Sequence, residues 1–261
     1  MEVLSFYVLL GAGAGLLSGM LGVGGGQVVV PGLLYIFHLK GFDPGVAVHM
    51  ALGTSLATIV VTSISSAISH NRRGSVNWAL VRKLVPGIVI GAVIGGLMSG
   101  LFSARVLRAA FGVFLLILAV QMAFSLRPSP QRALPGSPGT TATAGLIGWT
   151  SAIVGVGGGS MVVPFLAWCN VNIKSAVGTA SACGAPLALA GMIGFLAAGW
   201  GRADLPAYSA GYIYWPAWLG ISVCSLAFTP LGTWISHKLP VDALKRAFSV
   251  FLAIAGIRIL L

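Results

Sequence analysis

The sequence predicts an all-α polytopic membrane protein built from two inverted repeats, each a re-entrant or broken helical hairpin followed by three transmembrane helices. Hydrophobic residues make up 57% of the 261 residues and charged residues only 7%, with a mean hydropathy of +0.98. Soluble domains carry about a quarter charged residues. A glycine-rich stretch and several other blocks occur twice in the same order, which indicates an internal duplication.

The glycine-rich stretch lies at 22–31 and again at 155–164, and both copies read Gly-Val-Gly-Gly-Gly-x-x-Val-Val-Pro. Each glycine costs roughly 1 kcal/mol relative to alanine inside a helix, so we expect each helix to break here and restart at Gln27 or Ser160. In a membrane, broken backbone is tolerated only where it is buried in protein or lines a wet cavity. The restarted helix would point its free N–H groups and positive dipole end into that cavity, which favours an anion.

The first break interrupts an apolar run over residues 3–39. As one helix this run would measure about 55 Å, well beyond the hydrocarbon core of about 30 Å, so two pieces are required. We interpret each pair of pieces as a re-entrant hairpin with the glycine turn at its tip. The arms of the second copy, 141–154 and 160–171, are both short. The first arm of the first copy is longer, and the sequence leaves open whether it crosses fully.

Three apolar segments follow the first hairpin, at 46–69, 84–102 and 109–126. The middle segment carries small residues four apart, among them Gly87, Gly91 and Gly95, which favour close packing of helix backbones. The second half repeats the same order of segments.

Residues 127–140 are rich in Pro, Gly and Ser and are predicted to be a non-helical linker. They separate a first membrane repeat (1–126) from a second (141–261), and the two repeats form one integrated transmembrane domain. Pro86 and Pro216 are a further predicted match between the halves.

The net charge is +11, from 15 Lys and Arg against four acids. In a soluble protein this balance would suggest nucleic acid. Here the basic residues lie in short loops, where they set topology and meet membrane lipid, so we expect no nucleic-acid partner.

An odd number of crossings per repeat divides the basic residues unequally between the two sides. One side collects Arg72, Arg73, Arg82, Lys83, Arg127, Arg132, Lys174, Lys238, Lys245 and Arg246. The other side keeps Lys40, Arg105, Arg108, Arg202 and Arg258. Cytoplasmic loops carry the excess of Lys and Arg, which predicts a multi-pass protein of the cell membrane, the bacterial inner membrane, with both termini outside.

The arrangement resembles the sulfite exporter TauE/SafE family, also called the toluene sulfonate uptake permease family. The resemblance rests on the paired glycine motifs, on Ala-x-Gly-Thr at 51–54 and 176–179, and on Phe-x-Val-Phe-Leu at 111–115 and 248–252. It implies a transporter of a small sulfur-containing anion, sulfite or an organosulfonate such as sulfoacetate. The substrates of the family are diverse, so the exact molecule is not carried over.

The candidate substrate-binding residues are the glycines at the two breaks and the hydrogen-bond donors beside them or in the Ala-x-Gly-Thr motifs. They are Gly24, Gly25, Gly26, Gln27, Thr54, Ser55, Gly157, Gly158, Gly159, Ser160, Thr179 and Ser181. Alternatively, the breaks are packing kinks, and the Ser and Thr hydroxyls bond the carbonyl four residues earlier in their own helix. Pro31 and Pro164 are candidate hinges, or simple irregularities of the restarted helices.

The four acids, Glu2, Asp43, Asp204 and Asp242, all lie outside the middles of the apolar segments. The sequence therefore predicts no buried carboxylate for cation coupling, and we expect no metal, no cofactor and no enzymatic activity. His49 and Cys183 are interpreted as structural. The predicted function is an anion permease working by alternating access, with an anion channel using the same site as the alternative. Transport direction, coupling ion and oligomeric state are left open.

Overall fold

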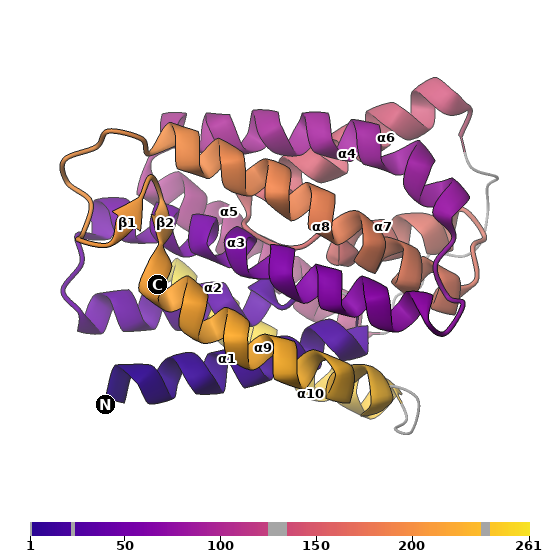
Figure 1. Ribbon diagram of the computed structural model, residues 1–261, viewed down its shortest axis with the longest axis horizontal. Coiled ribbons are helices and arrows are strands. Elements are labelled where there is room, and N and C mark those ends of the chain that lie inside the picture. The colour runs from indigo at the N-terminus through magenta and orange to yellow at the C-terminus, as the bar shows by residue number, and fades with distance from the viewer. Residues whose placement is uncertain (1, 22–23, 125–134, 236–240) are drawn as a thin grey trace.

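The computed structural model describes residues 2–21, 24–124, 135–235 and 241–261, and these form ten α-helices and one short β-hairpin (Figure 1). The first half contains α1 (Glu2–Leu21), α2 (Gly26–Leu39), α3 (Pro44–Asn71), α4 (Trp78–Met98), the 3-10 turn η1 (Ser99–Leu101) and α5 (Ala104–Ala123). The second half contains α6 (Ser137–Ile153), α7 (Gly159–Trp168), α8 (Ile173–Ala198), β1 (Ser209–Ala210), β2 (Ile213–Tyr214), α9 (Trp215–Ile235) and α10 (Val241–Leu260).

Five of these helices are long and apolar enough to cross a membrane, namely α3, α4 extended through Leu101, α5, α8 and α9. Shorter apolar helices cover Ser5–Met20, Gly26–Leu39, Gly159–Trp168 and Phe248–Leu260 within the described residues. The predicted all-α polytopic class is confirmed, while the number of crossings per repeat stays a prediction.

Each half begins with a hairpin whose two arms meet at a glycine break. Gly24 and Gly25 have φ values of 83° and 73°, and Gly155 has 65°, a region that side chains other than glycine rarely adopt. Gly22 and Val23, the start of the first motif, lie outside the described residues. In Figure 1 the α1–α2 hairpin opens at the left-hand end, where the N-terminus lies, and the α6–α7 hairpin opens at the opposite end. The two tips therefore approach each other from opposite ends, as inverted repeats predict.

The two halves interlock through strips of small residues. Helix α1 packs along α9, and its counterpart α6 packs along α4. A Cβ atom added to Gly15 of α1 would lie 2.5 Å from the Ser225 carbonyl oxygen, and one added to Gly95 of α4 would lie 2.6 Å from the Trp149 oxygen. These distances confirm that the small residues of 84–102 serve close helix packing.

Two details of the sequence interpretation are wrong. Helix α6 begins at Ser137, so 137–140 is helical although the linker was predicted to run to residue 140. Pro138 causes no break because proline is accommodated in the first turn of a helix; residues 127–134 lie outside the described part of the chain. Pro86 and Pro216 are not equivalent, because Pro86 lies in the middle of α4 and Pro216 in the first turn of α9.

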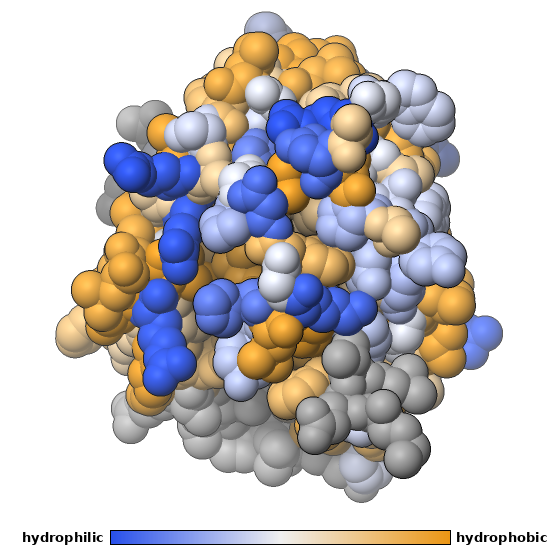
Figure 2. Space-filling model, turned by 90° about the vertical axis from the view of Figure 1, so that its left-hand side faces the viewer, coloured by the Kyte–Doolittle hydropathy of each residue, from blue (hydrophilic) through white to orange (hydrophobic). Residues whose placement is uncertain are grey.

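The described basic residues divide between the two ends of the molecule as the sequence predicts. Lys40 follows α2, Arg105 begins α5, and Arg202 precedes the β-hairpin, all at the left-hand end of Figure 1. Figure 2 looks onto this end, where hydrophilic side chains gather between hydrophobic flanks. Arg72 follows α3 and Lys174 begins α8 at the opposite end. Which end faces the cytoplasm stays a prediction.

Candidate functional site

The tips of the two hairpins touch in the interior of the protein. The Gln27 side-chain Nε2 donates a hydrogen bond to Ser160 Oγ at 3.1 Å, and the two side chains are 1% and 7% exposed. A Cβ atom on Gly26 would lie 2.8 Å from the Gly155 carbonyl oxygen, so no larger residue fits there without a shift. The structure thus brings together both predicted breaks and the two polar residues that restart the helices.

Helix α3 holds both tips in place. Ser55 Oγ donates to the Gly155 carbonyl at 2.9 Å, and Thr62 Oγ1 donates to the Gly24 carbonyl at 3.2 Å. Both side chains are fully buried. Ala180 stands on α8 where α3 has Ser55, so the hydrogen bond that Ser55 donates has no equivalent from α8. Thr62 is not among the residues predicted from the sequence, although its position seven residues after Ser55 places the two on one helix face.

The start of α7 offers unoccupied hydrogen-bond donors. Gly158 caps this helix without any side-chain hydrogen bond. The N–H groups of Gly157, Gly158 and Gly159 make no hydrogen bond to any other described residue, and all three glycines are buried. Ser160 Oγ lies beside them and donates to the Gly157 carbonyl at 3.2 Å. Free N–H groups at a helix start attract an anion.

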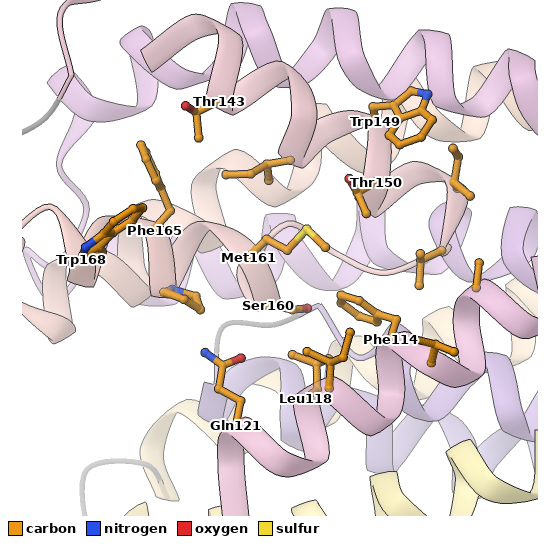
Figure 3. A pocket seen from close by; sticks show the side chains of 17 residues that line it. Phe114, Leu118, Gln121, Thr143, Trp149, Thr150, Ser160, Met161, Phe165 and Trp168 are labelled. Atoms are coloured by element: carbon orange, nitrogen blue, oxygen red, sulfur yellow. The ribbon is translucent and has the colours of Figure 1, made fainter. Parts of the chain in front are cut away.

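A cavity of about 650 Å³ lies between α5, α6 and α7, and Ser160 is one of its lining residues (Figure 3). Its wall is mostly apolar, with aromatic rings from Phe114, Trp149, Phe165 and Trp168. Polar groups come from Ser160, Gln121, Thr143 and Thr150, and none of the described residues that line it is charged. Gln121 rises from α5 into the space beside Ser160 (Figure 3). Ser160, at the tip of the second hairpin, therefore lies in the wall of an open and largely apolar cavity.

The sequence predicted neither this cavity nor the involvement of Gln121. The sequence signal for an open space here is the short second arm of the second hairpin, since α7 has 10 residues and its counterpart α2 has 14.

Thr54 and Thr179 bond to backbone segments outside the hairpin tips and have a common structural role. The Tyr214 N–H donates to Thr54 Oγ1 at 2.9 Å, and the Asn77 N–H donates to Thr179 Oγ1 at 3.1 Å. Each Ala-x-Gly-Thr motif therefore holds the chain segment that enters a long helix of the other half, α9 for Thr54 and α4 for Thr179.

The glycine of each motif explains this close approach. A Cβ on Gly53 would lie 2.5 Å from the Tyr212 carbonyl oxygen, and one on Gly178 would lie 2.5 Å from the Ser75 oxygen. Only glycine lets the backbone pass at these positions. A direct role of the two threonines in substrate binding stays a prediction.

Ser181 confirms the alternative interpretation of the Ser and Thr hydroxyls, in which the hydroxyl bonds within its own helix. Its Oγ donates to the Val177 carbonyl, four residues earlier, at 3.0 Å, and accepts from Ser66 Oγ at 3.2 Å. Of the two candidate hinges, Pro31 lies within α2 and Pro164 within α7, where Pro164 also lines the cavity. Whether they act as hinges stays a prediction.

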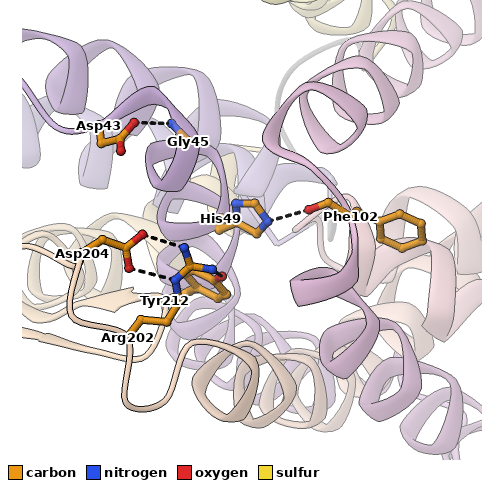
Figure 4. Close-up of polar contacts among 7 residues, drawn as sticks. All are labelled: Asp43, Gly45, His49, Phe102, Arg202, Asp204 and Tyr212. Atoms are coloured by element: carbon orange, nitrogen blue, oxygen red, sulfur yellow. Dashed lines mark hydrogen bonds and ion pairs between the residues drawn. The ribbon is translucent and has the colours of Figure 1, made fainter.

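His49, in the second turn of α3, belongs to a polar cluster that includes residues of the loop before α9 (Figure 4). Its Nε2 lies 3.1 Å from the Phe102 carbonyl, and its ring stacks on Tyr212 with centroids 4.8 Å apart. Arg202 donates to the Tyr212 hydroxyl at 3.0 Å and to both carboxylate oxygens of Asp204. The hydrogen bond from Arg202 holds the pKa of Asp204 below its usual range. This cluster fastens the loop before α9 onto α3, which agrees with a structural His49.

Within the described part of the chain, no group of three or more His, Cys, Asp and Glu is placed to hold a metal ion. Cys169 and Cys183 are buried free thiols, and Cys224 is half-buried. The chemistry available at the hairpin tips is therefore hydrogen bonding by amide, hydroxyl and backbone N–H groups.

Comparison with known proteins gives a consistent picture. A sequence profile described as sulfite exporter TauE/SafE matches residues 7–259. A probable membrane transporter protein of Haemophilus influenzae is 39% identical over 255 residues, which cover 97% of each chain. A probable membrane transporter protein of Methanocaldococcus jannaschii is 28% identical over 261 residues, covering 99% of this chain and 96% of its own. No solved structure matches this chain.

Proposed function

The chain belongs to the sulfite exporter TauE/SafE family, and we propose that this membrane transporter moves a small sulfur-containing anion by alternating access around the two hairpin tips. The proposal places it in the cell membrane with both termini outside. The observation that carries it is the Gln27–Ser160 contact between two restarted helices, with a cavity that reaches Ser160 from one side.

At the hairpin tips the anion is bound by dipoles and hydrogen bonds and not by a cationic side chain. The N–H groups of Gly157, Gly158 and Gly159 and the positive end of α7 supply the favourable potential. Gln27 Nε2 and Ser160 Oγ are donors that now bond within the protein. An arriving oxyanion competes for these donors and so loosens the contact between the two tips.

The wall of the cavity favours an organosulfonate over sulfite. Inorganic sulfite exposes charge on every side, and burial against apolar rings costs free energy wherever no hydrogen bond replaces water. An organosulfonate presents its charged group to the α7 start and its carbon body to rings such as Phe165 and Trp149. Most of its surface is then matched by the wall.

Alternating access, in preference to a channel, is supported by the one-sided position of the cavity. Its described lining comes from α5, α6, α7 and Val154, and no residue of α1, α2 or α3 borders it. Beyond Ser160 the path meets the contact of Gly26 with Gly155 and the hydrogen bond from Ser55. A substrate that enters on this side is stopped at the tips until they rearrange.

Counterflow in proteoliposomes tests the proposal. Vesicles loaded with an unlabelled organosulfonate should accumulate the labelled compound transiently, because a carrier exchanges one molecule for another, and uptake should saturate. Flux that rises linearly with concentration and shows no exchange would support the channel instead. Failure of every sulfonate and of sulfite to be transported would contradict the proposed substrate class.

A further inference from the structure

The repeat relation makes the region between α1, α2 and α10 the counterpart of the cavity between α5, α6 and α7. The paired glycine motifs relate α1 and α2 to α6 and α7, and the Phe-x-Val-Phe-Leu blocks relate α10 to α5. Gln27 then stands at the inner end of this region, where Ser160 stands in the cavity. We call this region the counterpart groove.

The counterpart groove is closed in this structure. The Leu10 side chain of α1 lies directly against Gly32 of α2, so close that a Cβ on Gly32 would overlap it. The equivalent residues in the other half, Thr143 and Phe165, both line the open cavity. At the outer end, Phe6 packs edge-on against Tyr35 with centroids 6.0 Å apart, and α2 also contacts α10. The same architecture is thus open on one side and filled on the other.

One residue makes the two grooves chemically different. The counterpart of Gln121, the amide that rises into the open cavity, is Arg258 in the last turn of α10. Arg258 is exposed and forms no ion pair or hydrogen bond with any residue of 5–20, 24–124, 135–235 or 248–261. A guanidinium offers paired N–H donors that match the oxygens of a sulfonate or carboxylate.

We infer that the counterpart groove is a second anion-binding site, with Arg258 at its mouth and Gln27 at its inner end, and that it opens when Leu10 separates from Gly32. This inference rests on the proposed alternating access. Arg258 then supplies a cation at the mouth of the counterpart groove, whereas the open cavity has the Gln121 amide at the matching position. The two sides of the protein therefore capture an anion with different groups.

A disulfide lock tests the opening without relying on transport. In a background with Cys169, Cys183 and Cys224 replaced by alanine, Leu10→Cys and Gly32→Cys are combined. A Cβ on Gly32 lies 3.0 Å from Leu10 Cγ, which brings the two sulfur atoms within bonding reach. Val28 is the counterpart of Met161, which lines the open cavity. A matched variant without the lock carries Val28→Cys, and the reaction of this cysteine with a membrane-impermeant maleimide reports whether the counterpart groove is open.

The reporter should react from the Arg258 side while Leu10 and Gly32 are native, and an added organosulfonate should change its rate. Absence of labelling at Val28→Cys under all conditions would overturn the groove. Oxidation of the Leu10→Cys/Gly32→Cys pair should abolish counterflow, and reductant should restore it, whereas each single cysteine should be insensitive to oxidant. Undiminished counterflow after complete cross-linking would refute the opening while leaving the proposed function intact.

Arg258→Gln tests the anion contact. For substrate added on the Arg258 side, its KM should rise at least about tenfold, since hydrogen bonds to charged groups contribute on that order, and Arg258→Lys should recover part of the loss. Arg108→Gln is the matched control, because Arg108 is an exposed arginine of α5 near the same end. Equal KM values for Arg258→Gln and Arg108→Gln would contradict the assignment, whatever the transport rate.

Discussion

Replacing Thr54 with valine separates a structural role of the Ala-x-Gly-Thr motif from a substrate-binding role. The Tyr214 N–H donates to Thr54 Oγ1 at 2.9 Å, and Thr54 is fully buried. Valine keeps the shape but removes the acceptor, so a buried N–H is left without a partner. The cost is about 1–3 kcal/mol of folding stability.

The chain offers two matched comparisons for this substitution. Thr179→Val removes the acceptor of the Asn77 N–H and should cost a similar amount. Thr58→Val should cost much less, because Thr58 Oγ1 donates to the Thr54 carbonyl in its own helix, and that carbonyl keeps its helical bond. Thr54→Ser retains the hydroxyl and should stay close to the native protein.

The assay is thermal unfolding of detergent-purified variants together with their affinity for an organosulfonate. We expect Thr54→Val and Thr179→Val to lower the melting temperature by about a few degrees, with affinity changed little in the folded protein. An unchanged melting temperature with a tenfold loss of affinity would refute this reasoning and make Thr54 a binding residue.

Three further substitutions and one pH change follow from the contacts. Ser55→Ala removes the hydrogen bond to the Gly155 carbonyl and should slow counterflow severalfold with the protein still folded, because the second tip is held less firmly. Gly91→Leu should prevent recovery of monodisperse protein in size-exclusion chromatography, since a side chain there meets the backbone of α6. Phe165→Ala should weaken binding of an aromatic sulfonate more than binding of sulfite, as measured by titration calorimetry. The pKa of Asp204 is depressed by Arg202, so the loop contact is complete above the normal carboxyl pKa and is lost as pH falls through the lower, folded-state value; protease cleavage of this loop should increase only in that acid range.

The hairpins and their meeting point could be predicted because each depends on a local rule combined with the duplication. Four glycines in five positions stop a helix wherever they occur, and an inverted copy must point its tip back toward the first. The small residues of α4 were likewise informative, because their four-residue spacing places them on one face. These features need no knowledge of which side chains meet.

The cavity and the hydrogen bonds that hold the tips depend on contacts between side chains from different helices, and these contacts could not be predicted. Leu10 fills the space over Gly32, while Thr143 and Phe165 leave the equivalent space open, and nothing in the two motifs distinguishes these outcomes. Thr62 reaches the Gly24 carbonyl from α3, 38 residues later in the chain, and no local pattern indicates this contact.

The short β-hairpin is also a product of tertiary packing. Tyr212 is 1% exposed and lies between His49 and Phe195, so burial of this ring fixes a segment too short to signal strands by itself.

Anion binding to Gln27→Leu and Ser160→Ala shows whether the two hairpin tips hold the substrate. Purified protein is titrated with an organosulfonate, sulfite, sulfate and chloride while its melting temperature is followed, because a ligand of the native state raises it. Ser222→Ala is the control, as a buried serine outside the described cavity and the hairpin tips. We expect a sulfonate to stabilise the native protein and Ser222→Ala, and this stabilisation to be lost in both tip variants. Full stabilisation of Gln27→Leu and Ser160→Ala would contradict it, because the anion would then bind somewhere other than the meeting point of the two glycine breaks.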